Sequence, residues 1–145
     1  MDFLKSMAIS ASGLSAQHLR MNIISSNLAN LNSTQTAEGG PYRRKEVIFS
    51  ADPLQEDFDG MLESALDNEM CGVTVKQVVE DTSPLRSVYN PNHPQADKNG
   101  YVLMPNVNLI QEMGNMIDAS RGYEANLTVM STTKSMALKA LELAR

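Results

Sequence analysis

Side chains able to perform acid–base or nucleophilic chemistry are few in this sequence and form no recognisable catalytic pattern. Of the two histidines, His18 falls on a regular apolar pattern, where we expect a packing or interface role. His93 stands in a proline-rich stretch, which we expect to be an exposed loop. The sequence holds no nucleophile elbow, phosphate-binding loop or dinucleotide fingerprint. We therefore predict that the protein is not an enzyme and has no catalytic or cofactor-binding residues.

An acidic string, QEDFDG, is the best candidate for a metal site. If Gly60 is placed at the sixth position of a calcium-binding loop, Asp57 and Asp59 occupy the third and fifth positions. Gln55 then falls at the first position and Leu66 at the twelfth, where acidic ligands are required. The pattern fails at both ends. We predict no metal site and interpret these acids as a solvated face.

The composition excludes several classes of protein. A formal net charge of −5 argues against a nucleic-acid surface, and we interpret the one basic run, Arg43 to Lys45, as a solvated loop face. Cys71 is the only cysteine, so an intramolecular disulfide is impossible, and we expect it to be a small packing residue. We expect no transmembrane segment and no cleaved signal peptide, because residues 1–30 lack a continuous apolar core. A secreted fate would require another export route.

Apolar residues recur at alternating intervals of three and four near both ends of the chain. This heptad pattern is typical of helices that pack along a shared seam. We call the two sets the predicted heptad seams and expect them to form an assembly interface. They comprise Leu4, Met7, Leu14, Met21 and Leu28 in the first segment, and Leu109, Met113, Met116, Tyr123, Leu127, Met130 and Leu141 in the last.

Both predicted helices are weak on their own. Gly13, Gly114 and Gly122 each cost about 1 kcal/mol relative to alanine inside a helix. Packing must therefore stabilise these segments, with each covered Leu or Met contributing about 1.5–3 kcal/mol. A hairpin of the two helices would cover one stripe, and helices of other copies are the natural cover for the rest. The sequence does not distinguish contacts within one chain from contacts between chains.

The stretch SSNLANLNST ends the first apolar pattern with a group of asparagines. Asn27, Asn30 and Asn32 can bond their own backbone and tolerate left-handed conformations, so we interpret them as a helix-terminating signature that stops the helix near residue 31.

The middle of the chain contains several strand-like runs. Residues 46–49, 73–79, 85–89 and 101–104 read as strands, and residues 52–69 as a short acidic helix or ordered loop. The predicted fold class is α+β, with an antiparallel, coiled-coil-like inner domain and a small β-rich insertion. Its expected parts are residues 1–33, the N-terminal helix, residues 34–106, the central segment, and residues 107–145, the C-terminal helix.

Four stretches resemble a known family. SSNLANLNST, EGGPYRRKEVIF, GVTVKQVVEDTSPLRSVYNPNHPQADKNGYVLMPNVN and EMGNMIDASRGYEANLTVMSTTKSMALKALEL are similar to the axial proteins of the bacterial flagellum, and within them to the proximal rod subtype. Together these stretches cover nearly the whole chain. Residues 52–70 belong to the family's variable region.

The resemblance implies a structural subunit of the proximal rod of the flagellar basal body. It implies export by the flagellar type III apparatus without a cleaved signal, helical assembly of terminal helices in the periplasm, and transmission of torque. The implied partners are other copies of the chain, neighbouring rod proteins, the membrane-ring end of the basal body and, in transit, the export apparatus. The alternative from another class is a soluble coiled-coil adaptor or export chaperone, which would form a closed oligomer.

Overall fold

The computed structural model describes residues 3–37, 39–53 and 71–143. It contains two long helices that flank two short antiparallel hairpins, which confirms the predicted α+β class. The elements are α1 (Phe3–Ala29), β1 (Lys45–Pro53), β2 (Cys71–Glu80), β3 (Arg86–Tyr89), β4 (Tyr101–Met104) and α3 (Leu109–Leu143). The predicted acidic helix or loop at residues 52–69 lies almost entirely outside the described residues.

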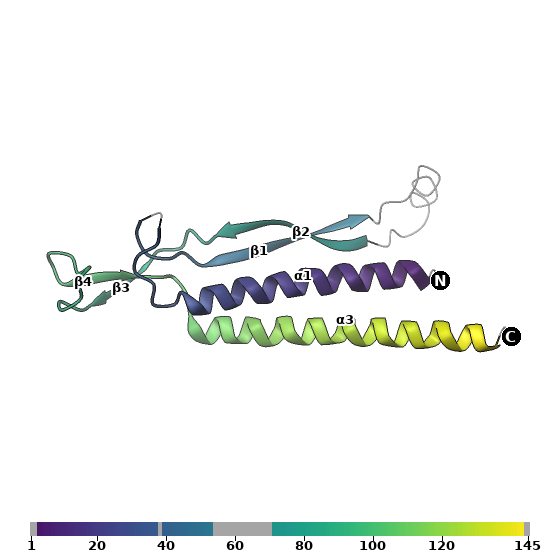
Figure 1. Cartoon of the computed structure of the whole chain (residues 1–145). Helices are drawn as coiled ribbons and strands as arrows, with labels where there is room; N and C mark the ends of the chain where they lie inside the picture. Colours follow the sequence, from purple (N-terminus) through teal and green to yellow (C-terminus); the bar gives the residue numbers. More distant parts are fainter. Residues whose placement is uncertain (1–2, 38, 54–70, 144–145) are drawn as a thin grey trace.

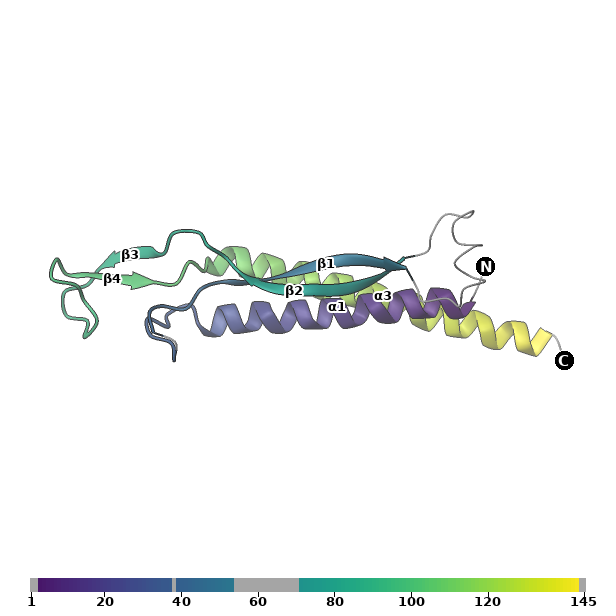
Figure 2. The ribbon, with the colours of Figure 1, turned by 90° about the horizontal axis from the view of Figure 1, so that it is seen from above.

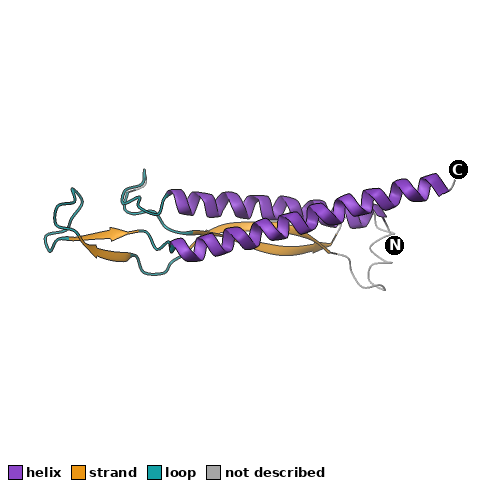
Figure 3. Cartoon of the chain, turned by 90° about the horizontal axis from the view of Figure 1, so that it is seen from below, coloured by secondary structure: helices purple, strands orange, loops and turns teal. Residues whose placement is uncertain are grey.

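The elements form three layers in which α1 is the middle one. Helices α1 and α3 run antiparallel along each other, and the β1–β2 hairpin lies along the opposite side of α1 (Figures 1 and 2). The β3–β4 hairpin projects beyond one end of the helix pair, and α1 begins and α3 ends toward the other end (Figure 3). Because α1 is covered on two sides and α3 on one, most of the surface of α3 is left to solvent.

The two helices approach closely because glycines face short side chains of the partner helix. A Cβ atom built on Gly13 would lie 2.8 Å from the Asn126 side-chain nitrogen, and one on Gly122 would lie 3.2 Å from that of Gln17. These glycines, which weaken each helix in isolation, therefore make room for the helix–helix contact.

The side chains of α3 that are buried or half-buried along α1 also follow intervals of four and three. One such series comprises Glu112, Met116, Ala119, Tyr123, Asn126, Met130, Thr133 and Ala137, and Asn115, Ser120 and Gly122 are half-buried beside it. This set shares Met116, Tyr123 and Met130 with the predicted heptad seam. It differs at two positions, where Glu112 is buried in place of Met113 and Asn126 is half-buried in place of Leu127. At position 126 the close approach of Gly13 explains the choice, and at position 112 the hydrogen bond between Glu112 and Asn27 explains it.

The β1–β2 hairpin is a two-stranded antiparallel sheet whose register shifts between Ile48 and Phe49. The backbone N–H of Val73 donates to Ser12 Oγ at 3.0 Å, which attaches β2 to α1. Such a sheet is marginal alone, so its contact with α1 stabilises it. All four predicted strands are confirmed, and β1 continues four residues beyond the predicted end at Phe49.

Helix α1 ends at Ala29, two residues before the predicted end, and by a different mechanism. None of the described residues other than glycine has a positive φ, so the expected left-handed asparagine is absent from this part of the chain. Instead, Asn30 Nδ2 donates to the Ser26 carbonyl at 2.9 Å, and Ser33 Oγ donates to Asn30 Oδ1 at 3.0 Å. Only Asn30 therefore contributes these local bonds at the end of the helix.

The interior is small for the length of the chain. The buried hydrophobic residues of the described part are Ala16, Ile24, Tyr42, Val102, Val107 and Ala119. The accessible surface is 10594 Å², whereas a compact monomer of 15.9 kDa would expose about 7,400 Å². In the described ranges, neither helix has a stretch long and apolar enough to cross a lipid bilayer. The described helices and hairpins form an elongated arrangement (Figure 1).

Candidate functional site: a buried polar junction

Asn27 is the centre of a hydrogen-bond network where both helices meet the start of β1. Its side chain is completely buried, and its Nδ2 donates to the Lys45 carbonyl at 2.8 Å and to Glu112 Oε2 at 2.9 Å. Its Oδ1 accepts from the Lys45 N–H at 2.9 Å and from the Tyr42 hydroxyl at 2.9 Å. One amide therefore joins α1, the segment before β1, β1 itself and α3.

Glu112 supplies the charge of this network from the first turn of α3. It is completely buried, and its Oε1 accepts from Arg44 Nε at 2.8 Å and from Asn115 Nδ2 at 3.3 Å. Asn108 is the N-cap residue of α3, because its Oδ1 accepts a hydrogen bond from the Ile110 N–H at 3.0 Å. A carboxylate in the first turn is also favoured by the helix dipole.

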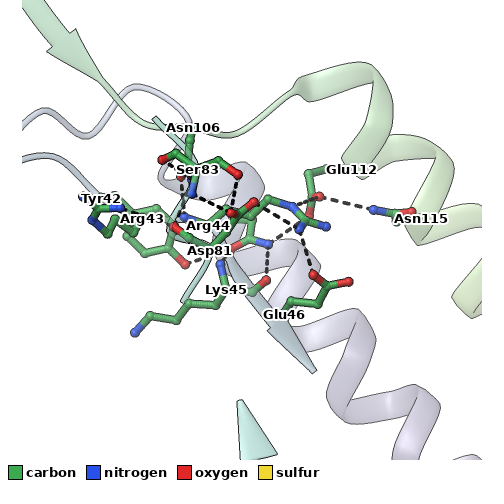
Figure 4. Close-up of polar contacts among 11 residues, drawn as sticks. Tyr42, Arg43, Arg44, Lys45, Glu46, Asp81, Ser83, Asn106, Glu112 and Asn115 are labelled. Atoms are coloured by element: carbon green, nitrogen blue, oxygen red, sulfur yellow. Dashed lines mark hydrogen bonds and ion pairs between the residues drawn. The ribbon is translucent and has the colours of Figure 1, made fainter. Parts of the chain in front are cut away.

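Arg44 connects the buried carboxylate to the surface of the molecule. Its side chain is 13% exposed and forms ion pairs with Glu112 at 2.8 Å and Glu46 at 3.2 Å (Figure 4). Burial acts to lower the pKa of Arg44, but the hydrogen bond and charge of Glu112, together with Glu46, raise this pKa above its ordinary value. Arg44 therefore stays charged, and its planar guanidinium donates to the Glu112 carboxyl group at the edge of the interior.

A second group of polar contacts joins the two hairpins beside Arg44. Asn106 Oδ1 accepts from the Arg44 N–H at 2.8 Å, and Asn106 Nδ2 donates to the Asp81 carbonyl at 3.1 Å. The Asp81 carboxylate accepts from the hydroxyl and the backbone N–H of Ser83. These two bonds lower the pKa of Asp81, with a smaller contribution from the charge of Arg44. The segment after β2 is thereby fixed to the residues that precede α3.

This arrangement is suited to holding elements together and not to catalysis. We call it the polar junction and define it by Asn27, Tyr42, Arg44, Asn106 and Glu112. Its acceptors are occupied by donors of the protein itself, and none of its members is a nucleophile beside a base. Within residues 3–37, 39–53 and 71–143, no group of three or more His, Cys, Asp or Glu side chains could hold a metal ion.

The structure places the residues of the predicted heptad seams in two environments. Their partly buried members are Met7, Leu14, Met21, Leu28, Met116, Tyr123 and Met130. Their exposed members are Leu4, Leu109, Met113, Leu127 and Leu141. His18 is also exposed. A role of these residues in assembly stays a prediction.

None of the five members of the junction was predicted from the sequence to take part in such a site, and the interpretation of Arg44 was wrong. Arg44 belongs to the basic run interpreted as a solvated loop face, yet its side chain is mostly buried against Glu112. Asn27 was assigned to helix termination, but it lies inside α1 and binds residues distant in the sequence. One sequence feature could have indicated this site. Glu112 begins a series of small or polar residues spaced seven apart, which continues with Ala119, Asn126 and Thr133.

Comparison with known proteins identifies the class of protein to which this architecture belongs. Residues 7–35 match the family described as "Flagella basal body rod protein", and residues 98–143 match the family described as "Flagellar basal body rod FlgEFG protein C-terminal". Asn27 lies in the first match and Glu112 in the second. The paired terminal helices thus define an axial protein of the flagellar rod.

Full-length relatives narrow this class. The chain is 44% identical to the flagellar basal-body rod protein FlgC of Borreliella burgdorferi over 147 aligned positions, which cover 97% of each chain. It is 43% identical to FlgC of Salmonella typhimurium, covering 99% of this chain and 98% of the relative, and 42% identical to FlgC of Bacillus subtilis, covering 97% of each. The chain belongs to the FlgC family of flagellar basal-body rod proteins. Membership confirms the resemblance, the structural and non-enzymatic role, and the location in the flagellar basal body.

The junction predicts that Asn27→Ala is strongly destabilising. We expect the free energy of unfolding to fall by about 2–4 kcal/mol, because the buried Glu112 oxygen and the Lys45 backbone groups lose their partners. Urea unfolding followed by circular dichroism would measure this. The control is Asn32→Ala, an exposed site at which we expect a change within about 0.5 kcal/mol. Equal effects at both positions would contradict a special role for Asn27.

The Asp81–Ser83 contact predicts a pH-dependent effect of Ser83→Ala. The pKa of Asp81 is lower in the folded chain than in the unfolded chain, where it is about 3.9. Its contribution to stability is therefore full above that value and is lost as the pH falls through the folded pKa. At pH near 7 we expect Ser83→Ala to lower the free energy of unfolding by about 1 kcal/mol. The difference should disappear toward about pH 2.

Urea unfolding of the unsubstituted chain and of Ser83→Ala between about pH 2 and pH 7 tests whether the effect depends on the Asp81 charge. Ser87→Ala, at an exposed position in β3, is the control and should show no pH-dependent difference. A deficit of Ser83→Ala that stays constant down to the lowest pH would mean that the hydroxyl acts independently of the Asp81 charge.

Proposed function

We propose that the chain is a subunit of the proximal rod that assembles helically, through the exposed faces of its terminal helices, with copies of itself and with neighbouring rod proteins. The observation that carries this proposal is the number of large apolar side chains left exposed on α3. They are Leu109, Ile110, Met113, Ile117, Leu127, Val129, Met136, Leu138, Leu141 and Leu143. So many exposed large apolar side chains on one helix are unusual for a monomeric protein and favour an interaction surface.

The accessible surface supports the same proposal. The chain exposes roughly 3,000 Å² more than a compact monomer of its mass would. Obligate assemblies bury about 2,000–5,000 Å² at their interfaces. The excess is therefore similar to the area that subunit contacts bury in a permanent assembly. Heterologous contacts between subunits can repeat along a helical assembly.

The polar junction supports a mechanical role in this proposal. Its hydrogen bonds and ion pairs join α1, α3 and both hairpins at one end of the helix pair, so the hairpins cannot rotate about the helices without exposing Glu112 and Asn27 unpaired. Buried polar groups are costly to separate from their partners. We propose that this joint passes torque between the inner helices and the outer hairpins of the rod.

We further propose that the chain passes through the flagellar type III apparatus unfolded and completes its folding when neighbours cover its helices. Few apolar side chains are buried inside the chain, and ordering the backbone costs about 1–2 kcal/mol per residue. The first half of α1, which is farthest from the junction, contains one of the four buried residues of this helix, Ser10. Its folding therefore depends most on burial that only the assembly supplies.

Hydrogen exchange tests folding coupled to assembly. In the dilute chain we expect amides in the first half of α1 to exchange within seconds to minutes, whereas in purified basal bodies they should be protected. Amides of β4 and the start of α3, near the buried Val102 and Glu112, serve as the internal reference and should be protected in both samples. Strong protection along the whole of α1 in the dilute chain would contradict this mechanism.

The assembly proposal predicts that Leu127→Glu blocks incorporation into the rod. Leu127 is 50% exposed on α3, so the charge should not disturb the monomer, but burying it between subunits would be costly. We expect loss of swimming and absence of the chain from purified basal bodies in cells that express only this variant. Thr128→Glu adds the same charge to the next residue, which is exposed and points about 100° away from Leu127 around the helix, and it is the control for this face of α3.

Circular dichroism would verify that both variants keep the helix content of the unsubstituted chain. Normal swimming with Leu127→Glu, or an equal loss with Thr128→Glu, would contradict the use of this face of α3. If the unsubstituted chain were itself absent from basal bodies, the structural role would be wrong as a whole.

A further inference from the structure

One asparagine of the sequence, Asn99, is followed directly by a glycine. It lies in the loop that joins β3 to β4, at the end of the molecule opposite the last residues of α3 (Figure 1). Asparagine is a thermolabile residue, because the backbone nitrogen of the next residue can attack its side-chain amide. Glycine hinders this attack least, since it has no side chain. Asn99 is therefore the asparagine whose sequence context most favours loss of the amide.

The reaction at Asn99 would be an intramolecular acyl transfer. The Gly100 nitrogen loses its proton and attacks the side-chain carbonyl carbon of Asn99, so a new C–N bond forms. The bond from that carbon to the side-chain nitrogen breaks, and this nitrogen leaves as ammonia after taking up a proton. Water then opens the cyclic imide at either carbonyl, which yields aspartate or β-linked isoaspartate. Nothing is oxidised or reduced, and water is the only co-reactant.

The loop holds the attacking nitrogen in a closed turn. The Gly100 N–H donates to the Asp97 carbonyl at 2.7 Å, and the Asp97 N–H donates to the Tyr101 carbonyl at 2.8 Å. Gly100 has a φ of +79°, and its carbonyl accepts from the Asn90 N–H at 2.8 Å. A β-turn followed by a left-handed glycine is a common hairpin connection. Both backbone polar groups of Gly100 are therefore bonded within the hairpin.

A tyrosine ring covers Gly100. A Cβ atom built on this glycine would lie 2.8 Å from Tyr89 Cε2 and 3.3 Å from Pro91 Cβ. Tyr89 also packs edge to face against Tyr101, with the ring centroids 5.3 Å apart. Asn99, in contrast, is exposed. The amide that would leave is thus open to water, whereas the nitrogen that would attack it is fixed.

We propose that Asn99 is a modification site that the closed β3–β4 hairpin protects. The side-chain amide is lost by ring closure onto Gly100 when the turn is open, and it is retained when the turn is closed. Ring closure requires the N–H proton to leave and the Asn99–Gly100 peptide to rotate, and both changes break the bond to Asp97. The inference goes beyond the proposed function, and it holds whether or not the chain assembles into a rod.

The isoaspartyl product explains why the site matters to the fold. It places an extra carbon in the main chain of the turn, so the bonds of Asp97 to Gly100 and to Tyr101 cannot both form again. Chains that stay unfolded for longer would therefore accumulate copies that cannot close the hairpin.

Rates of amide loss in the full chain, measured in native buffer and in urea at the same pH and temperature, test the proposal. Peptide mass spectrometry locates the change, and an isoaspartyl methyltransferase assay detects the β-linked product. We expect Asn99 to react at least about tenfold more slowly in native buffer, because the hydrogen bonds of the turn must open first. Asn92 is exposed in the same loop but is followed by histidine, so it should react more slowly than Asn99 in urea.

Tyr89→Ala tests the role of the covering ring. We expect the reaction at Asn99 to become about two- to tenfold faster in native buffer, because the aromatic contact that helps to close the hairpin is lost. The rate in urea should not change. Ser87→Ala, at an exposed position two residues earlier on the same strand, is the matched control and should change neither rate. Circular dichroism would verify that both variants keep their helices.

Three results would overturn the inference. They are a rate at Asn99 in urea no greater than that at Asn92, equal rates at Asn99 in native buffer and in urea, and a rate in native buffer that Tyr89→Ala leaves unchanged. Asn99→Gln has a longer side chain that cannot close the same ring, so the product should disappear from this peptide. Its persistence in that variant would also contradict the assignment.

Discussion

The contact between the Asn27 amide and the Glu112 carboxylate is the constraint on which the rest of the structure depends. Both side chains are completely buried, so each requires its partner. Asn27 also bonds the backbone N–H and carbonyl of Lys45, which fixes where β1 begins. The register of the helices, the position of the hairpin along α1 and the charge of Arg44 at the edge are therefore linked. Moving any one of them leaves a buried polar group without a partner.

Much of the fold follows from patterns that are local in the sequence. Heptad spacing predicted both helices, and alternating β-branched residues predicted the strands, because these patterns report on the faces of single elements. The junction could not be found this way. Its central contact joins residues 85 positions apart, and the same asparagine and arginine types also occur in turns and on solvated loops. A pattern identifies a residue as suited to several environments, whereas the tertiary contact decides between them.

The helix–helix seam shows the same limit more sharply. Heptad spacing is present on α3, but two sets of residues follow it in part. One set contains Met113 and Leu127, and the other contains their preceding neighbours Glu112 and Asn126. The larger residues, Met113 and Leu127, are exposed, and small or polar residues face α1 instead. Hydrophobicity favours the first set, and close approach at Gly13 and Gly122 favours the second. Apolar side chains that are not used inside the chain are thereby left exposed on α3, where the proposed assembly would use them.

Polar and apolar contacts have different tasks in this molecule. A buried ion pair contributes little net stability, because desolvation offsets most of its attraction, but it tolerates few alternative geometries. Apolar surface stabilises strongly and is less selective about orientation. The chain places the selective contacts at the junction, inside the subunit, and the apolar contacts on α3, where further molecules can bind. The junction thus fixes how the exposed faces are oriented before any neighbour arrives. Because a rigid shaft needs every subunit to present its surfaces at the same angle, an internal polar joint is suited to the proposed assembly, in which the contacts between subunits would be mainly apolar.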